Sequence, residues 1–367
     1  MYTLDVDAST PYRVHIGTFL LERVGAIARE AAGGRRAVIV TDSNVGPLYA
    51  APVKTGLEEA GYETGVFTFE AGERSKRAQT YISILEYLAS RELTRTDVVV
   101  ALGGGVVGDV AGFAAATYMR GCRLVQVPTS LLAMVDSSVG GKTAIDLEAG
   151  KNLAGAFWQP SAVVADVGCL ATLEPAQFAD GCGEVVKHAA IADADLFAEL
   201  ERTPLTLDLL MRDVERTALL IARNIDIKRA VVAADERESG VRKLLNFGHS
   251  IGHAVEACDR YRTGHGTCVA IGMVAIAHAA AARGACPAEV PARIEALAAA
   301  HGLATRTDRG ADELFAAALH DKKRTGDDID LVIPHRIGAC SIERVPLTEF
   351  RALIGDGLDE NGDEPEC

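Results

Sequence analysis

The stretch that decides the fold is residues 97–109, which read DVVVALGGGVVGD. It opens with a short run of β-branched and apolar residues, which is typical of a strand buried on both faces of a parallel sheet. Gly103, Gly105 and Gly108 then match the pattern G-x-G-x-x-G, directly before an apolar segment that favours a helix. Glycines let the backbone approach a pyrophosphate, and a helix N-terminus supplies N–H donors. The stretch therefore predicts a dinucleotide loop, although tight turns without a ligand use the same residues.

The partner for a ribose is expected elsewhere in the chain. A strict dinucleotide unit carries an acid about twenty residues beyond the glycines, and residues 123–129 contain none. Asp42 ends an earlier apolar run and is a plausible substitute.

Similar strand-like runs lie on both sides of this stretch, at residues 12–16, 37–42, 64–69, 124–128 and 162–166. Helical segments separate them, and this alternation predicts a parallel, Rossmann-like sheet with helices on its faces. After about residue 172 the chain turns to long Ala/Leu/Glu/Arg-rich amphipathic segments, with one late hairpin at residues 329–342.

We therefore expect three parts. An NAD-binding α/β domain covers residues 1–172, and a mainly α-helical domain with the metal and substrate residues covers 173–355. An acidic tail, expected to be disordered, covers 356–367. The ligand is expected in the cleft between the two domains.

Composition narrows the class of protein. Of 367 residues, 49% are hydrophobic and 24% are charged, which is ordinary for a soluble enzyme. The net charge of −14 gives no global electrostatic case for binding nucleic acid or an anionic membrane. The eight cysteines form no CxxC pair, and we find neither an apolar signal segment nor an apolar run that could span a bilayer. We expect a cytoplasmic protein with reduced thiols.

A second informative stretch is residues 245–256, LNFGHSIGHAVE, which is followed by His265 between two glycines. His249 and His253 are four residues apart in a helical segment, so both side chains leave one face. Two imidazoles with one carboxylate form a common ligand set for a catalytic zinc. A polar helix end is the alternative for any single histidine.

The third ligand has to come from elsewhere in the chain. Glu184 is the candidate, although its spacing from Lys187 equally fits an intrahelical salt bridge. Ligation by Cys258 or Cys268, which flank His265, is less favoured.

Several cations lie in apolar or glycine-rich surroundings or near these motifs: Arg120, Lys142, Lys151, Lys187, Lys228 and Arg242. Such contexts indicate capture of an anionic ligand, with solvated surface charge as the alternative. Residues 139–143 (VGGKT) are not a P-loop, because Asp136 stands where the first glycine belongs and residues 130–135 favour a helix.

Taken in order, these motifs resemble the 3-dehydroquinate synthase family of sugar phosphate cyclases. The resemblance runs from about residue 41 to residue 337. It rests on residues 103–109, 112–114, 116–121, 127–133, 135–143, 150–152, 184–187, 245–256 and 321–323. It implies NAD as a recycled cofactor, a divalent metal (zinc or cobalt), and a seven-carbon sugar-acid phosphate that is cyclised with loss of phosphate.

The resemblance also assigns residues by position. The implied metal ligands are Glu184, His249 and His265. The implied catalytic and substrate residues are His253, Lys142, Lys187, Lys228, Arg242, Asn246, Asn152, Lys151, Asp136, Arg120 and one of Lys322 and Lys323. The implied NAD contacts are Asp42, Asn44, Glu73, Lys76, Gly104, Gly105, Val106, Asp109, Thr129, Ser130, Lys142, Lys151 and Thr172.

The resemblance further implies a homodimer, since Arg120 reaches the phosphate across a subunit interface in this family. Two departures are visible. Thr267 stands where the family commonly has Glu, and Ala189 stands where it often has Gly. The first would affect the support of His265.

Three other functions remain open. Other sugar phosphate cyclases share the cofactor and the metal ligands, and metal-dependent polyol dehydrogenases share the two-domain plan but need fewer cations. A non-enzymatic metal- or nucleotide-binding regulator would release no phosphate.

Overall fold

The computed structural model describes residues 1–319 and 324–358. It consists of two compact units, one made of Met1–Glu174 with Leu207–Arg237 and the other of Pro175–Thr206 with Glu238–Cys367. Lys322 and Lys323 lie outside the described residues.

The assignment of residues 207–237 differs from the division expected at residue 172. These residues form α7 (Leu207–Arg212) and α8 (Val214–Ala234), and they belong to the first unit instead of the second. The reason is packing, because α8 lies against β1, β2 and η4 of the first unit.

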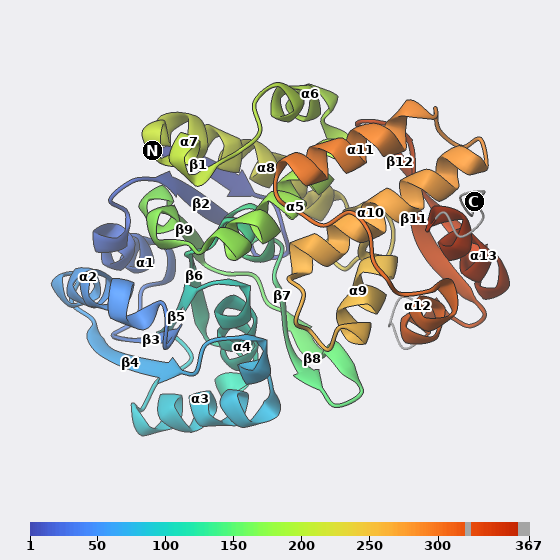
Figure 1. Ribbon diagram of the computed structural model, residues 1–367. Helices are drawn as coiled ribbons and strands as arrows, with labels where there is room; N and C mark the ends of the chain where they lie inside the picture. The colour runs from blue at the N-terminus through green and yellow to red at the C-terminus, as the bar shows by residue number, and fades with distance from the viewer. Residues whose placement is uncertain (320–323, 359–367) are drawn as a thin grey trace. The chain divides into compact units, whose positions relative to one another are not determined.

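The first unit is built on a seven-stranded sheet with the order β1-β2-β9-β6-β5-β3-β4. Only β1 and β2 pair antiparallel, and the other neighbours are parallel (Figure 1). The strands are β1 (Tyr2–Val6), β2 (Tyr12–Gly17), β3 (Arg36–Asp42), β4 (Glu63–Phe69), β5 (Val98–Gly103), β6 (Arg123–Pro128) and β9 (Ala162–Asp166). The predicted Rossmann-like α/β architecture is confirmed.

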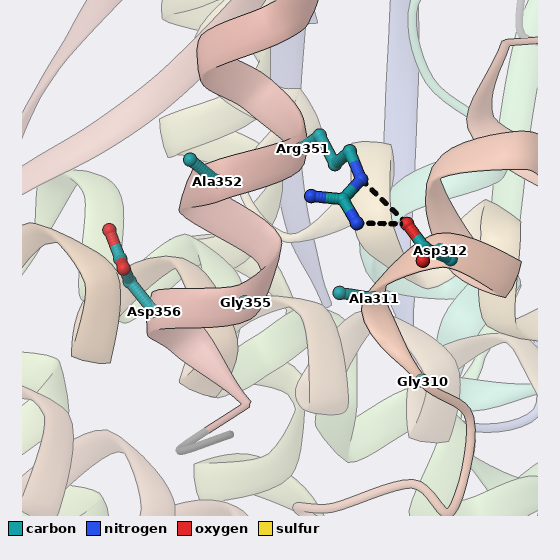
Figure 2. Close-up of a pocket in the computed structure, with 7 residues that line it drawn as sticks. All are labelled: Gly310, Ala311, Asp312, Arg351, Ala352, Gly355 and Asp356. Carbon is teal, nitrogen blue, oxygen red and sulfur yellow. Dashed lines mark hydrogen bonds and ion pairs between the residues drawn. The ribbon is translucent and has the colours of Figure 1, made fainter. Parts of the chain in front are cut away.

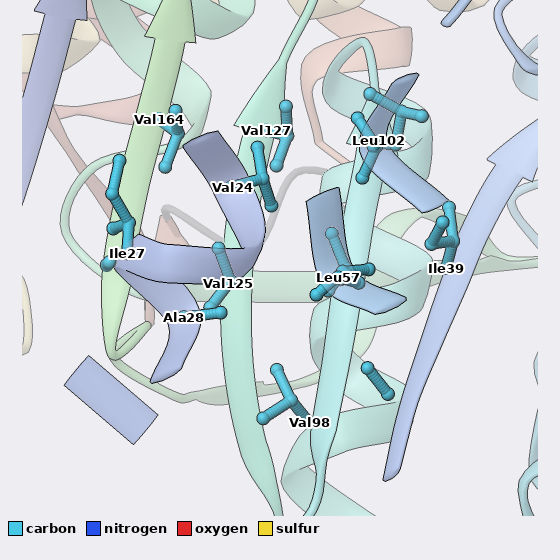
Figure 3. Packing of buried hydrophobic residues seen from close by; sticks show 14 of the residues in the cluster. Val24, Ile27, Ala28, Ile39, Leu57, Val98, Leu102, Val125, Val127 and Val164 are labelled. Atoms are coloured by element: carbon cyan, nitrogen blue, oxygen red, sulfur yellow. The ribbon is translucent and has the colours of Figure 1, made fainter. Parts of the chain in front are cut away.

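Helices cover both faces of this sheet. They are α1 (Val24–Ala32), α2 (Gly46–Glu59), α3 (Ala78–Ser90) and α4 (Gly105–Thr117). The same unit contains the short 3₁₀ helices η1 (Leu21–Arg23), η2 (Glu73–Ser75), η3 (Tyr118–Arg120) and η5 (Val167–Thr172), and the π-helix η4 (Ala133–Ser137). On one face, Val24 and Leu57 of α1 and α2 pack against Val98, Val125 and Val164 of the strands (Figure 3). A second core forms from α3 and α4 against the other face. The β-branched runs are therefore buried on both sides, as the sequence predicts.

A hairpin of β7 (Lys142–Leu147) and β8 (Gly150–Phe157) extends from the first unit and was not expected from the sequence. It packs on α3 and α4. The segment before it is helical, with η4 a π-helix, so residues 139–143 do not follow a strand as a P-loop requires.

The second unit is mainly helical, as predicted. Its elements are α5 (Pro175–Ala192), α6 (Ala194–Arg202), η6 (Val241–Asn246), α9 (His249–Cys258), α10 (His265–Ala282), α11 (Glu289–Ala300), α12 (Ala311–Ala318), α13 (Leu347–Gly357), and a small antiparallel sheet of β10 (Arg324–Thr325), β11 (Asp328–Arg336) and β12 (Ala339–Pro346). The centre of the unit is α10, against which α5, α9, α11 and α13 pack (Figure 1). The predicted late hairpin is β11 and β12.

Two expectations about this unit need correction. We expected no apolar run that could span a bilayer. By length and composition alone α10 could cross a membrane, but 72% of its apolar window is buried, as in the core helix of a globular unit. The region expected as a tail begins inside α13, where Asp356 forms an ion pair with Arg283 (3.0 Å). Residues 359–367 lie outside the described residues.

Candidate active site

Three elements of the second unit bring Glu184, His249 and His265 together, from α5, α9 and α10. Glu184 Oε1 lies 3.3 Å from His265 Nε2 and 3.7 Å from His249 Nε2. Donor atoms held about 2.1 Å from a tetrahedral ion are themselves about 3.4 Å apart. One ligand atom from each residue lies within 4.8 Å of the others, so the three fit a single zinc-sized cation.

The other ring nitrogens of both histidines are already engaged. His249 Nδ1 lies 3.2 Å from the Phe247 carbonyl oxygen, and His265 Nδ1 lies 2.9 Å from Glu256 Oε1. An imidazole that donates through Nδ1 presents the lone pair of Nε2, which is the form that binds a metal. Glu256 is buried, so this support is fixed by packing. The donor set therefore fits a metal in chemistry as well as in geometry.

The electrostatics of the cluster favour a positive charge. Burial lowers the pKa of His265, but the Glu256 and Glu184 carboxylates outweigh it and raise that pKa to about 10. Glu184 also contacts the Lys187 ammonium group through Oε2, while Oε1 faces the histidines. Glu184 thus makes the expected intrahelical salt bridge through one oxygen and leaves the other beside the two histidines.

His253 lies beside these three residues, one turn further along α9. Its ring centroid is 5.3 Å from that of His249 and 5.9 Å from that of His265. It also belongs to a second cluster with Glu256 and His265. A third imidazole, placed next to a metal site, would be suited to proton transfer or to hydrogen bonding with a ligand.

Close helix packing makes this convergence possible, and the sequence reasoning did not use its signal. A Cβ on Gly183 would lie 2.6 Å from the Gly266 carbonyl oxygen, and one on Gly252 would lie 2.8 Å from that of Cys268. Gly248 has φ +79°, and a Cβ there would lie 2.5 Å from the Val269 carbonyl oxygen. These glycines let α5 and α9 approach α10 at backbone distance.

Two of the predicted substrate residues in the second unit, Lys187 and Arg242, are buried cations. Arg242 is fully buried on η6 and Lys187 is 1% exposed. Asn246 donates a hydrogen bond to Glu238 Oε1 (2.6 Å). Buried cations have to be compensated by nearby acids or by an anionic ligand.

The first unit holds a separate cluster of predicted residues at the carboxyl ends of its strands. The chain leaves β3 for the edge strand β4, and leaves β5 in the other direction for β6, so the strand order reverses between β3 and β5. Ligands of open α/β sheets bind at such a switch point. Val40 pairs with Ala101, so two residues further on Asp42 and Gly103 end neighbouring strands there.

The glycine loop at this point is open to a phosphate. Gly104 is the N-cap of α4 and makes no side-chain cap hydrogen bond, so the cap residue does not take up the first N–H groups of the helix. A Cβ on Gly104 or Gly105 would meet nothing closer than the Ser130 and Ser137 hydroxyls, at 3.5 and 3.2 Å. Backbone donors, hydroxyls and the Asp42 carboxylate together fit a dinucleotide.

The remaining predicted residues of the first unit form ion pairs around the hairpin. Lys76 pairs with Asp109 (2.6 Å) and Lys151 with Glu73 (2.7 Å). Burial lowers the pKa of Lys76, but the Asp109 and Glu73 carboxylates outweigh it and raise that pKa. The backbone N–H of Asn152 donates to Asp146 Oδ1 (2.8 Å). The Lys151–Glu73 pair thus joins β8 to η2, and the Lys76–Asp109 pair joins the end of η2 to α4.

Within the same unit, Lys228 links α8 to η4. Its ammonium group lies 2.8 Å from Asp136 Oδ1 and donates to the Asp136 carbonyl oxygen (2.6 Å). Lys142 begins β7, and the Thr172 hydroxyl lies 2.6 Å from that of Tyr49. Arg120, exposed on η3 with φ +64°, lies outside these networks in the described part of the chain.

One further hollow lies between α12 and α13 of the second unit. It is lined by Gly310, Ala311, Asp312, Arg351, Ala352, Gly355 and Asp356 (Figure 2). Its charged groups include the Arg351–Asp312 pair (2.5 Å), and none of the predicted site residues lines it. It is therefore separate from the site described above.

Comparison with known proteins identifies the family. Residues 66–180 match the model of the 3-dehydroquinate synthase N-terminal domain, and residues 181–324 match that of its C-terminal domain. The 3-dehydroquinate synthase of Streptococcus suis (strain 05ZYH33) is 43% identical over 348 residues, which cover 94% of this chain and 97% of that protein. The chain belongs to the 3-dehydroquinate synthase family.

Solved structures agree with this family assignment. The 2-epi-5-epi-valiolone synthase ValA from Streptomyces hygroscopicus subsp. jinggangensis 5008, with NAD+ and Zn2+ bound, has a TM-score of 0.85 and 27% identity over 95% of this chain and 97% of that one. A 2-deoxy-scyllo-inosose synthase complexed with carbaglucose-6-phosphate, NAD+ and Co2+ has a TM-score of 0.84 and 25% identity over 97% and 100%. Both cyclases share the two-domain fold of the 3-dehydroquinate synthase family.

The structure also accounts for one departure from the pattern of 3-dehydroquinate synthases. Thr267 donates through its amide and its hydroxyl to Asp180 Oδ1, at 3.1 Å each. The sequence reasoning missed Asp180 and Asp146, because nothing in their local sequence distinguishes them from other acids. Ala189 is buried in α5, and no described contact depends on its being Ala.

Proposed function

We propose that this chain converts 3-deoxy-D-arabino-heptulosonate 7-phosphate to 3-dehydroquinate and phosphate, a step of the shikimate pathway in aromatic amino acid biosynthesis. We propose that it recycles NAD and uses one divalent ion, zinc or cobalt. The observation that carries the proposal is the convergence of Glu184, His249 and His265 beside His253, in a chain 43% identical to a 3-dehydroquinate synthase.

Glu184, His249 and His265 would hold the metal, and Asp42 with the Gly104–Gly105 backbone would hold NAD. When bound, the ion supplies Lewis acidity at a substrate hydroxyl, and NAD accepts and later returns a hydride. Glu256 and the Phe247 carbonyl oxygen keep the two imidazoles in the tautomer that this requires.

The cations would orient an anionic substrate. Lys187 and Arg242 in the second unit, and Lys142, Lys151 and Lys228 in the first, carry charges complementary to a carboxylate and a phosphate. A flexible sugar acid held at both ends stays near attack geometry during elimination and ring closure. Asn152, Asn246 and Asp136 would complete the polar contacts.

His253 would move a proton. It lies beside both proposed metal-binding imidazoles, and imidazole is the side chain used most often for general acid–base catalysis. We assign it to proton transfer at the substrate. It would donate a proton to the departing phosphate oxygen or to the ring oxygen that is released when the ring opens.

The other NAD contacts in the proposal would be Asn44, Glu73, Lys76, Val106, Asp109, Thr129, Ser130 and Thr172.

The last part of the proposal concerns assembly and location. Exposed Arg120 would reach the substrate phosphate of a second copy in a homodimer. We place the enzyme in the cytoplasm, acting on a small anionic sugar phosphate and on neither nucleic acid nor membrane.

Phosphate release tests the function. The purified full chain is incubated with the seven-carbon substrate, NAD+ and Co2+, and inorganic phosphate and 3-dehydroquinate are measured together. Equal amounts of both products, lost on adding a chelator or omitting NAD+, are expected. Turnover of a different sugar phosphate, net NADH accumulation with a polyol, or no turnover would each contradict the proposal.

A further inference from the structure

The start of α10 has no capping side chain of its own. Its N-cap is Gly264, and its first residue is His265. Helix starts usually take an acceptor from an N-cap side chain, which accepts the N–H of the second or third helical residue. Here the acceptor comes from another helix, because Asp180 Oδ1 of α5 accepts the amide of the third residue, Thr267, and its hydroxyl.

The chain around His265 leaves room for this carboxylate. A Cβ on Gly264 would lie 2.0 Å from Asp180 Oδ2, and one on Gly266 would lie 2.0 Å from the Asp180 carbonyl oxygen. An ordinary capping side chain at position 264 therefore cannot coexist with Asp180 in this place. The helix start is built around a cap that another helix provides.

The capping carboxylate is connected to two of the three proposed metal-binding residues, Glu184 and His265. Asp180 and Glu184 are four residues apart on α5, so they share one face of that helix. Thr267 and His265 lie in the same first turn of α10. The bonds to Asp180 thus fix this turn against the face of α5 that carries Glu184, where Glu184 Oε1 lies 3.3 Å from His265 Nε2.

We propose that Asp180 is a positioning residue for the metal centre, capping α10 from α5 and thereby setting the distance between Glu184 and His265. The inference rests on the proposed function only in that these residues bind a divalent ion. Its role is distinct from that of Glu256, which holds the His265 ring through Nδ1. The Thr267 hydroxyl donates to Asp180, whereas a Glu side chain at this position would set a second carboxylate against it.

The test is the affinity of the full-length, metal-free protein for Co2+, measured by chelator competition together with the visible absorption of the bound ion. Residues that support metal ligands contribute about 10- to 100-fold in affinity, so Asp180→Ala is expected to weaken Co2+ binding by about that factor and to shift the absorption band. Asp180→Asn keeps an acceptor oxygen and loses only charge, so a loss of roughly threefold is expected. Thr267→Ser is expected to match the parent protein, and Thr267→Val to bind Co2+ more weakly.

Asp193→Ala is the matched control. It removes the N-cap of α6, where Asp193 Oδ1 accepts the Leu196 amide (2.9 Å), and is expected to lower the melting temperature without changing Co2+ affinity.

Parent-like Co2+ binding by Asp180→Ala would overturn the inference. So would an equal loss in Asp193→Ala, which would reduce the effect to general stability, or an equal loss in Asp180→Asn. If Asp180→Ala does not fold, equal affinities of Thr267→Val and Thr267→Ser would refute the role. Failure of the parent protein to bind Co2+ would instead refute the proposed function.

Discussion

The proposed nucleotide site of the first unit and the proposed metal site of the second offer different kinds of groups to a ligand. At the first, the groups offered to a ligand are mostly backbone: strand ends, a glycine loop and the uncapped N-terminus of α4. At the second they are side chains, Glu184, His249 and His265, each from a different helix. A backbone site is encoded in one contiguous stretch, whereas a side-chain site is encoded in the packing of several. The two should therefore respond differently to substitution and to pH.

The largest effect is expected from removing a metal ligand. His265→Ala takes away one of three donors, and losing several kcal/mol of charge stabilisation is expected to reduce phosphate release roughly 10⁴-fold. Metal content by atomic spectroscopy should fall in parallel, while NAD binding to the first unit should persist.

A buried histidine outside the cluster is the control for that change. His301 accepts the Leu205 amide through Nε2 (3.1 Å) and lies against the Leu297 carbonyl oxygen. His301→Ala should lower stability and leave the metal content unchanged. If His265→Ala kept both its metal and its activity, His265 would not be a metal ligand and the contrast between the two sites would fail.

Proton transfer is expected to come second in size. His253→Ala leaves the three ligands intact, so the variant should bind the metal normally and lose about 10²- to 10³-fold in kcat. Parallel measurements of metal stoichiometry and steady-state rate separate the two effects. Full activity would remove His253 from the proposed mechanism.

The pH dependence separates the two regions directly. The pKa of His265 is raised from 6.5 to about 10 in the metal-free protein, so a metal has to displace a proton between these values. Apparent Co2+ affinity should rise about tenfold per pH unit across this window. About one proton should be released per ion at pH 8, detectable with an indicator dye.

The same shift has a consequence for folding stability. Because the folded-state pKa lies above the unfolded one, the stabilisation is fully present below pH 6.5 and is lost as pH rises towards 10. The midpoint of urea unfolding of the metal-free protein should fall over this range, and should fall less in Glu256→Gln. NAD affinity should stay flat between pH 6.5 and 9, and a steep change there would contradict a backbone-built site.

The smallest effect is expected in the glycine loop, where two neighbouring positions form a matched pair. A Cβ on Gly104 meets nothing closer than 3.5 Å, and its φ of −76° suits alanine, so Gly104→Ala should fold normally and bind NAD about tenfold more weakly. A Cβ on Gly103 would lie 2.5 Å from Val107, so Gly103→Ala should lose about 1–3 kcal/mol of stability instead. Calorimetry of binding and thermal melting distinguish them, and unchanged NAD affinity in Gly104→Ala would argue against the loop as a phosphate site.

The sequence by itself determined what depends on neighbours along the chain. The β-branched runs specify buried strands, the glycines at 103–105 specify the loop before α4, and the four-residue spacing of His249 and His253 places both on one helix face. Each of these follows from the period of a strand or a helix and from the conformational freedom of glycine.

Only the tertiary structure decided which distant groups meet. It placed α8 with the first unit, brought Glu184 and Glu256 to His265, and supplied the cap of α10 from Asp180. Local propensity carries no information about these contacts, because they depend on how closely helices pack. That closeness is set by glycines such as Gly183 and Gly266, whose role becomes visible only when the partner backbone is in place.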